Sequence, residues 1–105
     1  MATTTKTPAI PTPDHLTVCR AMSLALITQR PKPVRARHVG EKLYGDEYLL
    51  QLDAWYSRRT DTFKAQYKAV TRGLKSAKDA GFLSYDSKKG WRLRASGQRL
   101  AAGDQ

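Results

Sequence analysis

The residues with the clearest capacity for chemistry are the cations that follow residue 60, and the chemistry they offer is binding of phosphate. From residue 60 onward the chain has ten Lys and Arg residues against four acids, whereas residues 35–59 have five against four. An unspecialised surface does not predict such a local excess. The pattern favours a polyanionic partner, with nucleic acid ahead of an anionic membrane.

Catalytic and metal-binding groups are scarce. The sequence shows no Ser-His-Asp set, Cys-His pair, phosphate-binding glycine loop or cluster of metal ligands, and its nine acids are scattered. His15 and His38 are interpreted as surface or capping residues. Asp86 beside Lys88 and Lys89 is ordinary turn chemistry and only faintly suggests a nuclease. We therefore expect no enzyme activity, no cofactor, no metal and no small-molecule ligand.

Composition limits the remaining possibilities. A chain of 105 residues with 40% apolar content fits one domain with a modest core, and its net charge is +10. The single Cys19 cannot form an internal disulfide and is expected to be a buried thiol. No apolar run approaches the roughly 20 residues of a membrane span, and residues 1–13 lack the apolar segment of a secretory signal. We expect a cytoplasmic protein without a membrane partner, associated with the nucleoid when bound.

The elements that must position the cations begin after an arm. Residues 1–11 are rich in Thr and Pro, which predicts a flexible arm, and residues 12–102 are expected to form the domain. Thr12 as N-cap and Pro13 at the first helical position predict a helix over about 13–29, before Pro31 and Pro33. Its predicted apolar face is Leu16, Cys19, Met22, Ser23, Leu26 and Ile27. Residues 103–105 are expected to fray.

Two further helices are predicted before residue 60. Residues 34–43 place Ala36, Val39 and Leu43 on one face, and Gly45 is expected to end that helix. Asp46 is then expected to cap an amphipathic helix that finishes near Arg58. Its apolar positions are Tyr48, Leu49, Leu52, Trp55 and Tyr56.

The cations themselves fall on a long predicted helix. Thr60 or Asp61 caps it, and it runs to about Ala80 before Gly81 ends it. At 100° per residue, a core-facing stripe of about 80° is predicted. That stripe is Phe63, Tyr67, Val70, Leu74 and Ala77. Lys64, Lys68, Thr71, Arg72 and Lys75 share a separate arc of about 100°. The arc is either a ligand-binding face or the solvated face of a surface helix.

A hairpin is predicted next. Residues 82–86 and 91–94 are the expected strands, and Gly90 supplies the positive φ of the turn. The aromatic and aliphatic residues of the strands, Leu83, Tyr85, Trp91 and Leu93, are expected to face the core rather than to stack on bases. The cations of the turn and return strand are Lys88, Lys89, Arg92 and Arg94. Ser96 is expected to cap a final short helix.

This order of elements resembles the winged helix-turn-helix family of DNA-binding domains. The segment VTRGLKSAKDAGFLSYDSKKGWRLRASGQRLA resembles the recognition helix and wing of bacterial regulators of the MarR, PadR and ArsR type. Two short segments carry the resemblance. In residues 79–83 a charged helix end is followed by Gly and an apolar strand, and in residues 93–97 the wing returns into a Leu-x-x-x-Gly segment. RARHVGEKLYG is similar to the first helix of the helix-turn-helix pair. The resemblance covers about residues 13–102.

The resemblance implies a mainly α fold with a small β-hairpin and sequence-specific binding of double-stranded DNA. It implies a homodimer that acts as a small transcriptional regulator or as a site-binding accessory protein of a plasmid or phage. The recognition helix, residues 61–80, would lie in the major groove and the wing, residues 82–94, on the minor groove or backbone. The implied contacts are Lys64, Gln66, Lys68, Thr71, Arg72 and Lys75 from the helix, with Lys88, Lys89 and Arg92 from the wing. Thr60 and Thr62 could donate to a phosphate at the helix start.

One departure from the family stands between Gly45 and Asp61, where 15 residues replace a turn of a few. The pattern predicts an inserted helix near 46–58 that serves as core, as a spacer that re-aims the recognition helix, or as a dimer surface. Two other functions stay open. The domain could dock on RNA polymerase or on another DNA-bound factor, or it could bind RNA.

Overall fold

Residues 10–103 are described by a computed structural model and form a mainly helical fold with one small antiparallel hairpin, as the sequence predicts. The predicted arm falls largely on residues 1–9, which lie outside the described residues, as do residues 104 and 105. The elements in order are α1 (His15–Gln29), α2 (Ala36–Tyr44), α3 (Asp46–Asp53), the 3-10 turn η1 (Tyr56–Arg58), α4 (Asp61–Asp79), β1 (Leu83–Asp86), β2 (Gly90–Leu93) and α5 (Ala95–Ala102).

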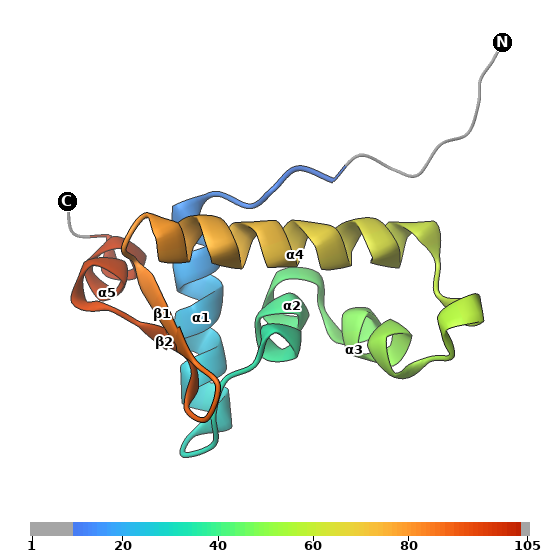
Figure 1. Cartoon of the computed structure of the whole chain (residues 1–105), viewed down its shortest axis with the longest axis horizontal. Coiled ribbons are helices and arrows are strands. Elements are labelled where there is room, and N and C mark those ends of the chain that lie inside the picture. The colour runs from blue at the N-terminus through green and yellow to red at the C-terminus, as the bar shows by residue number, and fades with distance from the viewer. Residues whose placement is uncertain (1–9, 104–105) are drawn as a thin grey trace, which may run out of the picture.

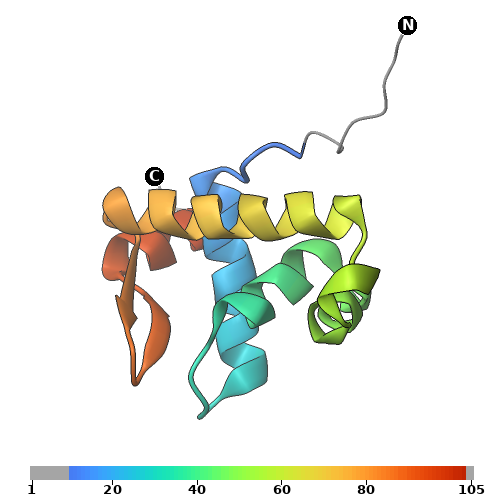
Figure 2. The same cartoon turned by 45° about the vertical axis from the view of Figure 1, so that its right-hand side comes forward.

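The longest helix, α4, organises the molecule. Figure 1 shows α4 above α1, α2 and α3, with the hairpin below one end and α3 below the other. The turned view in Figure 2 keeps this order. The two ends of α4 are therefore flanked by different elements, which are the hairpin and the inserted segment. We use the latter name for residues 46–58.

The first helix begins two residues later than predicted. Asp14, rather than Thr12, is the N-cap of α1, and its carboxylate accepts a hydrogen bond from the Thr17 N–H at 2.8 Å. A carboxylate also gains from the helix dipole, which a hydroxyl does not. The buried residues of α1 are Val18, Cys19, Ala21, Met22 and Ala25. Cys19 is thus buried as expected, but Ile27 is 67% exposed. Ile27 lies about 180° around the helix from Val18.

The core lies between α4 and the helices below it, and Tyr48 is its largest fully buried side chain. The Tyr48 ring lies against Phe63, with 5.1 Å between ring centroids. Gly40 lets Tyr48 approach α2, since a Cβ at Gly40 would overlap the ring. Burial raises the pKa of Tyr48 to about 12, so the phenol stays neutral.

The inserted segment is not the single helix that the sequence predicts. α3 ends at Asp53, Ala54 is extended with φ −77° and ψ 158°, and η1 follows. A continuous helix would place Trp55, seven residues after Tyr48, on the same face. The break at Ala54 prevents this, and Trp55 is 80% exposed while Tyr48 is 2% exposed. The segment therefore contributes one core anchor and one surface aromatic.

The long helix has the predicted bounds. The Thr60 hydroxyl oxygen accepts from the Phe63 N–H at 3.0 Å, and Gly81, with φ 89°, follows the helix end. The buried residues of α4 are Phe63, Ala69, Val70, Gly73, Leu74 and Ala77. Tyr67 was expected in this stripe but is 48% exposed. The packed face is shifted away from Tyr67 because α1 approaches at Gly73, where a Cβ would press on Pro13 and Val18.

The hairpin pairs Leu83 with Leu93 and Tyr85 with Trp91, and its turn uses Gly90 at φ 76° as predicted. Leu83 is buried, but Tyr85 is 46% exposed and does not face the core as expected. The outer half of the hairpin extends past the core, so the Tyr85 and Trp91 rings pack on each other with 5.0 Å between centroids. Alternation of apolar and polar residues along a strand does not show at which residue the strand extends beyond the core.

The last helix also begins differently from the prediction. Arg94, not Ser96, is the N-cap of α5. The Ser96 hydroxyl instead donates to the Gly81 carbonyl at 2.7 Å, which ties α5 to the end of α4. Gly103, with φ 88°, is the C-cap of α5, and its N–H donates to the Leu100 carbonyl at 3.1 Å.

Candidate nucleic-acid interface

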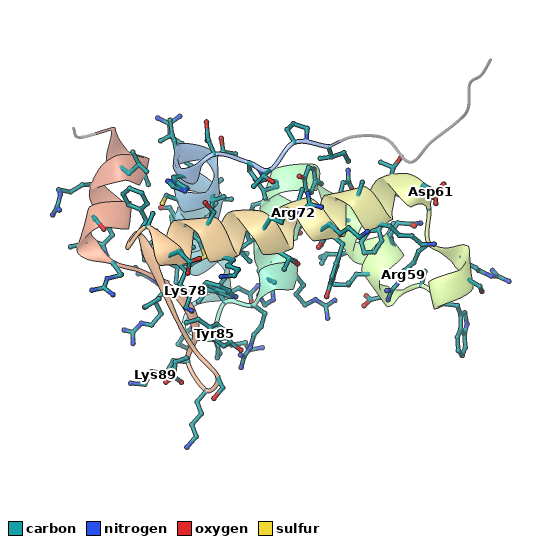
Figure 3. The ribbon with its side chains drawn as sticks, turned by 45° about the horizontal axis from the view of Figure 1, so that its top comes forward. Arg59, Asp61, Arg72, Lys78, Tyr85 and Lys89 are labelled. Atoms are coloured by element: carbon teal, nitrogen blue, oxygen red, sulfur yellow. The ribbon has the colours of Figure 1, made fainter. Side chains whose placement is uncertain are left out.

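One face of α4 is basic and turned to solvent. This basic face consists of Lys64, Lys68, Thr71, Arg72 and Lys75, of which Lys64 is half-buried and the others are exposed. Arg72 is labelled on this helix in Figure 3. The buried residues of α4 occupy the opposite side of the helix, so the exposed cations Lys68, Arg72 and Lys75 do not take part in core packing. The separation of a packed side and a basic side follows the predicted periodicity.

Two shallow grooves run along α4 and meet at Tyr67 and Lys68. The first, of about 390 Å³, is lined by Arg59, Phe63, Lys64, Tyr67 and Lys68. The second, of about 380 Å³, is lined by Tyr67, Lys68, Thr71 and Arg72. Tyr67 is thus a half-exposed ring between cations. A ring in this position can pack on a sugar or base while neighbouring cations hold phosphates.

The Thr71 hydroxyl can accept a hydrogen bond from a ligand but cannot donate one. It donates to the Tyr67 carbonyl at 3.0 Å, so the oxygen can still accept but its proton is committed. Phosphate oxygens offer no proton, whereas the amino groups of adenine and cytosine do. A contact from Thr71 to nucleic acid would therefore go to a base edge.

The remaining predicted residues of this helix are not all on the basic face. Thr60 accepts from the Phe63 N–H and keeps its hydroxyl proton for a ligand. Thr62 and Gln66 lie about 120° and 160° around α4 from Lys68. Gln66 is also half-buried. The structure brings Thr60 to the helix start and separates Thr62 and Gln66 from the cations.

The hairpin holds three of the predicted cations in exposed positions, with Lys88 and Lys89 in its turn and Arg92 on β2. Figure 3 shows Lys89 near the free end of the hairpin. The Asp86 carboxylate accepts from the backbone N–H of Lys88 at 2.8 Å and of Lys89 at 3.0 Å. Bonds from the Lys89 and Lys88 N–H groups hold the pKa of Asp86 below its ordinary value. Asp86 therefore shapes the turn, as the sequence predicts.

The hairpin is fixed to the segment that precedes α2. The Trp91 N–H donates to the Val34 carbonyl at 2.9 Å, and the Arg35 guanidinium donates to the Ser87 carbonyl at 3.2 Å. A Cβ at Gly90 would collide with the Val34 carbonyl oxygen. The cations of the turn therefore have a defined position relative to α4.

The exposed cations of the basic face differ in ion pairing. Lys75 and Asp79 form an exposed pair at 3.0 Å, which contributes little to stability. Lys68 and Arg72 have no ion pair with a carboxylate of residues 10–103. These two cations are therefore available to an anionic ligand.

Sequence reasoning missed two residues of this surface. Arg59 lines the first groove, donates to the Leu52 carbonyl at 2.7 Å and lies 5.5 Å from the Phe63 ring centroid. Arg59 precedes the helix cap, so helix periodicity gives no signal for it. The place of Tyr67 on this surface could have been predicted, because Tyr67 lies at the edge of the predicted apolar stripe that is nearest the basic arc.

Among residues 10–103, no group of three or more His, Cys, Asp and Glu residues is placed to hold a metal ion. None of the helices in this part of the chain is both long and apolar enough to span a bilayer. Comparison of the chain with models of protein families, with curated proteins and with solved structures found no match. Function is therefore inferred from the geometry of this chain alone.

Proposed function

We propose that this chain is a winged helix-turn-helix domain that binds double-stranded DNA, with α4 in the major groove and the hairpin on the adjacent minor groove or backbone. The observation that carries the proposal is the basic face of α4, which is largely exposed while the opposite face forms the core. A helix of about 10–12 Å diameter with its side chains matches a major groove about 12 Å wide.

The side chains divide into positioning and reading roles. Lys68 and Lys75 would hold phosphates, which fix the register of the helix but carry no sequence information. Arg72 can bond both acceptors of guanine, and Thr71 can accept from adenine or cytosine. The hairpin cations would hold the backbone beside the groove. Specificity would therefore come from the Thr71 and Arg72 turn of α4.

The class of function is a sequence-specific regulator of transcription or a site-binding accessory protein of a plasmid or phage, acting as a homodimer. Leu24 is 53% exposed and Ile27 is 67% exposed, and both lie on α1. These two residues are the candidate dimer contact. A two-fold dimer predicts a palindromic site with half-sites about 34–36 Å apart, which selection of duplexes from a random pool would reveal.

Charge reversal on the basic face tests the proposal. The variant Lys68→Glu/Arg72→Glu should weaken binding of a selected duplex about 100-fold in a polarisation titration, because two exposed cations that contact DNA are replaced by acids. The slope of log affinity against log salt should fall in magnitude by about 1, since Lys68 is lost as a phosphate contact and each such contact contributes about 0.9. Lys64 is left unchanged because it is half-buried.

The matched control is Arg20→Glu/Arg99→Glu, which makes the same change of net charge at exposed positions on α1 and α5. Its duplex affinity should stay within about threefold of the wild type, because long-range charge effects are screened by salt. Equal losses in the two variants would show that net charge alone drives binding. Absence of duplex binding by the wild type would favour a module that docks on a protein.

A further inference from the structure

A second basic groove lies away from the basic face of α4, between the hairpin and the segment that joins α1 to α2. It has a volume of about 450 Å³. Its lining residues are Leu26, Arg30, Pro31, Lys32, Pro33, Val34, Lys88, Lys89, Trp91 and Arg92. Half of them are cations, and no acid is among them. We call it the hairpin groove.

The charged and the apolar lining residues occupy different parts of the hairpin groove. Arg30 and Lys32 come from one lip, and the hairpin cations come from the other. The apolar residues between them include Trp91, which is half-buried. We propose that the hairpin groove binds single-stranded nucleic acid, with phosphates on the two lips and an unpaired base or sugar on the apolar lining beside Trp91.

The apolar lining distinguishes a single strand from the backbone of a duplex. A duplex keeps its bases paired and stacked, so its backbone would reach the cationic lips and leave the apolar residues uncovered. A single strand offers phosphates and an unpaired base together, and a basic groove with an aromatic side chain is the usual arrangement for such a ligand. The volume also lies within the range of about 300–1,000 Å³ that holds small ligands.

The groove is already formed without a ligand. The bond from Trp91 to Val34 and the bond from Arg35 to Ser87 join the segment that carries one lip to the hairpin that carries the other. Gly90 lets the backbones meet there, since any Cβ would strike Val34. A ligand therefore need not order the lips when it binds, which favours affinity.

This site does not depend on duplex binding by α4. The hairpin cations could serve both ligands, but Arg30 and Lys32 lie in the hairpin groove and not among the residues of the basic face. Substitution of Arg30 and Lys32 can therefore fail or succeed independently of Lys68 and Arg72. Together, the two surfaces would suit a duplex that ends in a single-stranded overhang.

The first test measures the fluorescence of Trp91. The chain has two tryptophans, so Trp55→Phe leaves Trp91 as the sole one. A deoxythymidine oligonucleotide of about 12 nucleotides, within the size range of single-strand sites, should quench Trp91 fluorescence as it binds. A blunt duplex of the same length should leave the emission nearly unchanged.

The second test uses Arg30→Glu/Lys32→Glu in the same background. Affinity for the oligonucleotide should fall about tenfold or more, and its salt slope should fall in magnitude by about 1.4, since each single-strand phosphate contributes about 0.7. Affinity for the blunt duplex should change less than about twofold if these cations serve only the groove. Arg30→Gln/Lys32→Gln is the milder pair, and Arg20→Glu/Arg99→Glu is the charge-matched control.

Two results would overturn the proposal. One is an oligonucleotide that leaves Trp91 fluorescence unchanged at saturation or does not bind. The other is an equal loss of duplex and single-strand affinity in Arg30→Glu/Lys32→Glu, which would assign these cations to the duplex surface. Single-strand binding that persists in Lys68→Glu/Arg72→Glu, with duplex binding lost, would separate the two sites.

Discussion

The hairpin and the inserted segment flank opposite ends of α4 and carry opposite charge. Residues 83–94 contain four cations and one acid, whereas residues 46–58 contain one cation and three acids. Each region also exposes an aromatic ring, with Tyr85 at 46% and Trp55 at 80%. A polyanion is attracted to the hairpin and repelled by the inserted segment. An exposed aromatic residue therefore marks a nucleic-acid surface only where cations surround it.

The two regions are also anchored differently. The inserted segment is held by Tyr48, which is buried against Phe63, while the hairpin is held through backbone contacts at Val34. One anchor depends on apolar burial and the other on hydrogen bonds and a glycine. Substitutions at the two anchors should therefore differ in kind as well as in size.

The largest expected effect is at the buried anchor. Tyr48→Ala should lower the free energy of unfolding by about 4 kcal/mol, because a large aromatic is removed from the core and leaves a cavity. Tyr85→Ala, at the half-exposed ring of the hairpin, should cost about 1 kcal/mol. Urea denaturation of both variants checks the contrast. Similar losses would show that the hairpin ring is as much a core residue as Tyr48.

The hairpin anchor is tested at its glycine. Gly90→Ala should cost about 2 kcal/mol, because alanine disfavours a positive φ and its Cβ strikes the Val34 carbonyl. Gly81→Ala is the matched control, with φ 89° and open space around it, and should cost about 1 kcal/mol.

Hydrogen exchange locates the Gly90 effect. The Trp91 amide donates to Val34, so it should exchange faster in Gly90→Ala than in Gly81→Ala. An unchanged Trp91 amide would mean that the hairpin holds its place without this contact.

The junction of the inserted segment with α4 should show a smaller effect. Thr60 caps α4, and its own N–H donates to the Gln51 side chain at 2.8 Å. Thr60→Ala should lower the free energy of unfolding by about 1 kcal/mol through loss of the cap. Thr12→Ala, at the residue that the sequence pattern predicts as a cap and the structure does not use, should be near neutral, and thermal unfolding of both variants checks the difference.

The smallest effect is a pH dependence beside the hairpin anchor. His38 Nδ1 accepts from the Arg35 N–H at 2.8 Å, and burial, with Arg37 nearby, lowers the pKa of His38 below its ordinary 6.5. The unfolded chain then binds more protons than the folded one, so stability rises with pH. The His38 contribution is full above pH 6.5 and is lost as pH falls through the lower folded pKa.

Unfolding measured between about pH 5 and 7.5 checks this linkage. His38→Gln removes the titrating group while keeping a side chain that can accept a hydrogen bond, so its stability should vary less with pH than that of the wild type. An equally steep profile in His38→Gln would assign the pH dependence to other groups.

Glycines and the cap of α4 made much of the fold predictable. Gly45, Gly81 and Gly90 mark the ends of α2 and α4 and the hairpin turn because each adopts a positive φ. Thr60 marks the start of α4 through a hydroxyl that satisfies a free N–H. These signals are local, so the sequence carries them directly.

The misplaced residues depend on neighbours far away in the chain. Tyr67 and Tyr85 follow regular apolar periodicity, but no element within residues 10–103 covers them fully, and periodicity does not show how far a core extends. The hairpin groove needs Lys32 and Lys88 from segments that only folding brings together. The basic face of α4 could be predicted because all its residues belong to one helix.

The central claim is that the basic face of α4 binds duplex DNA, and its most direct test is a salt series. Wild-type protein and Lys68→Glu/Arg72→Glu would be titrated into a labelled selected duplex from about 50 to 200 mM salt. The wild type should bind, with a slope of log affinity against log salt near −5.4 for about six phosphate contacts, and the variant slope should be near −4.5 because one phosphate contact is lost. No binding at about 50 mM salt, or equal slopes for the two proteins, would contradict the claim.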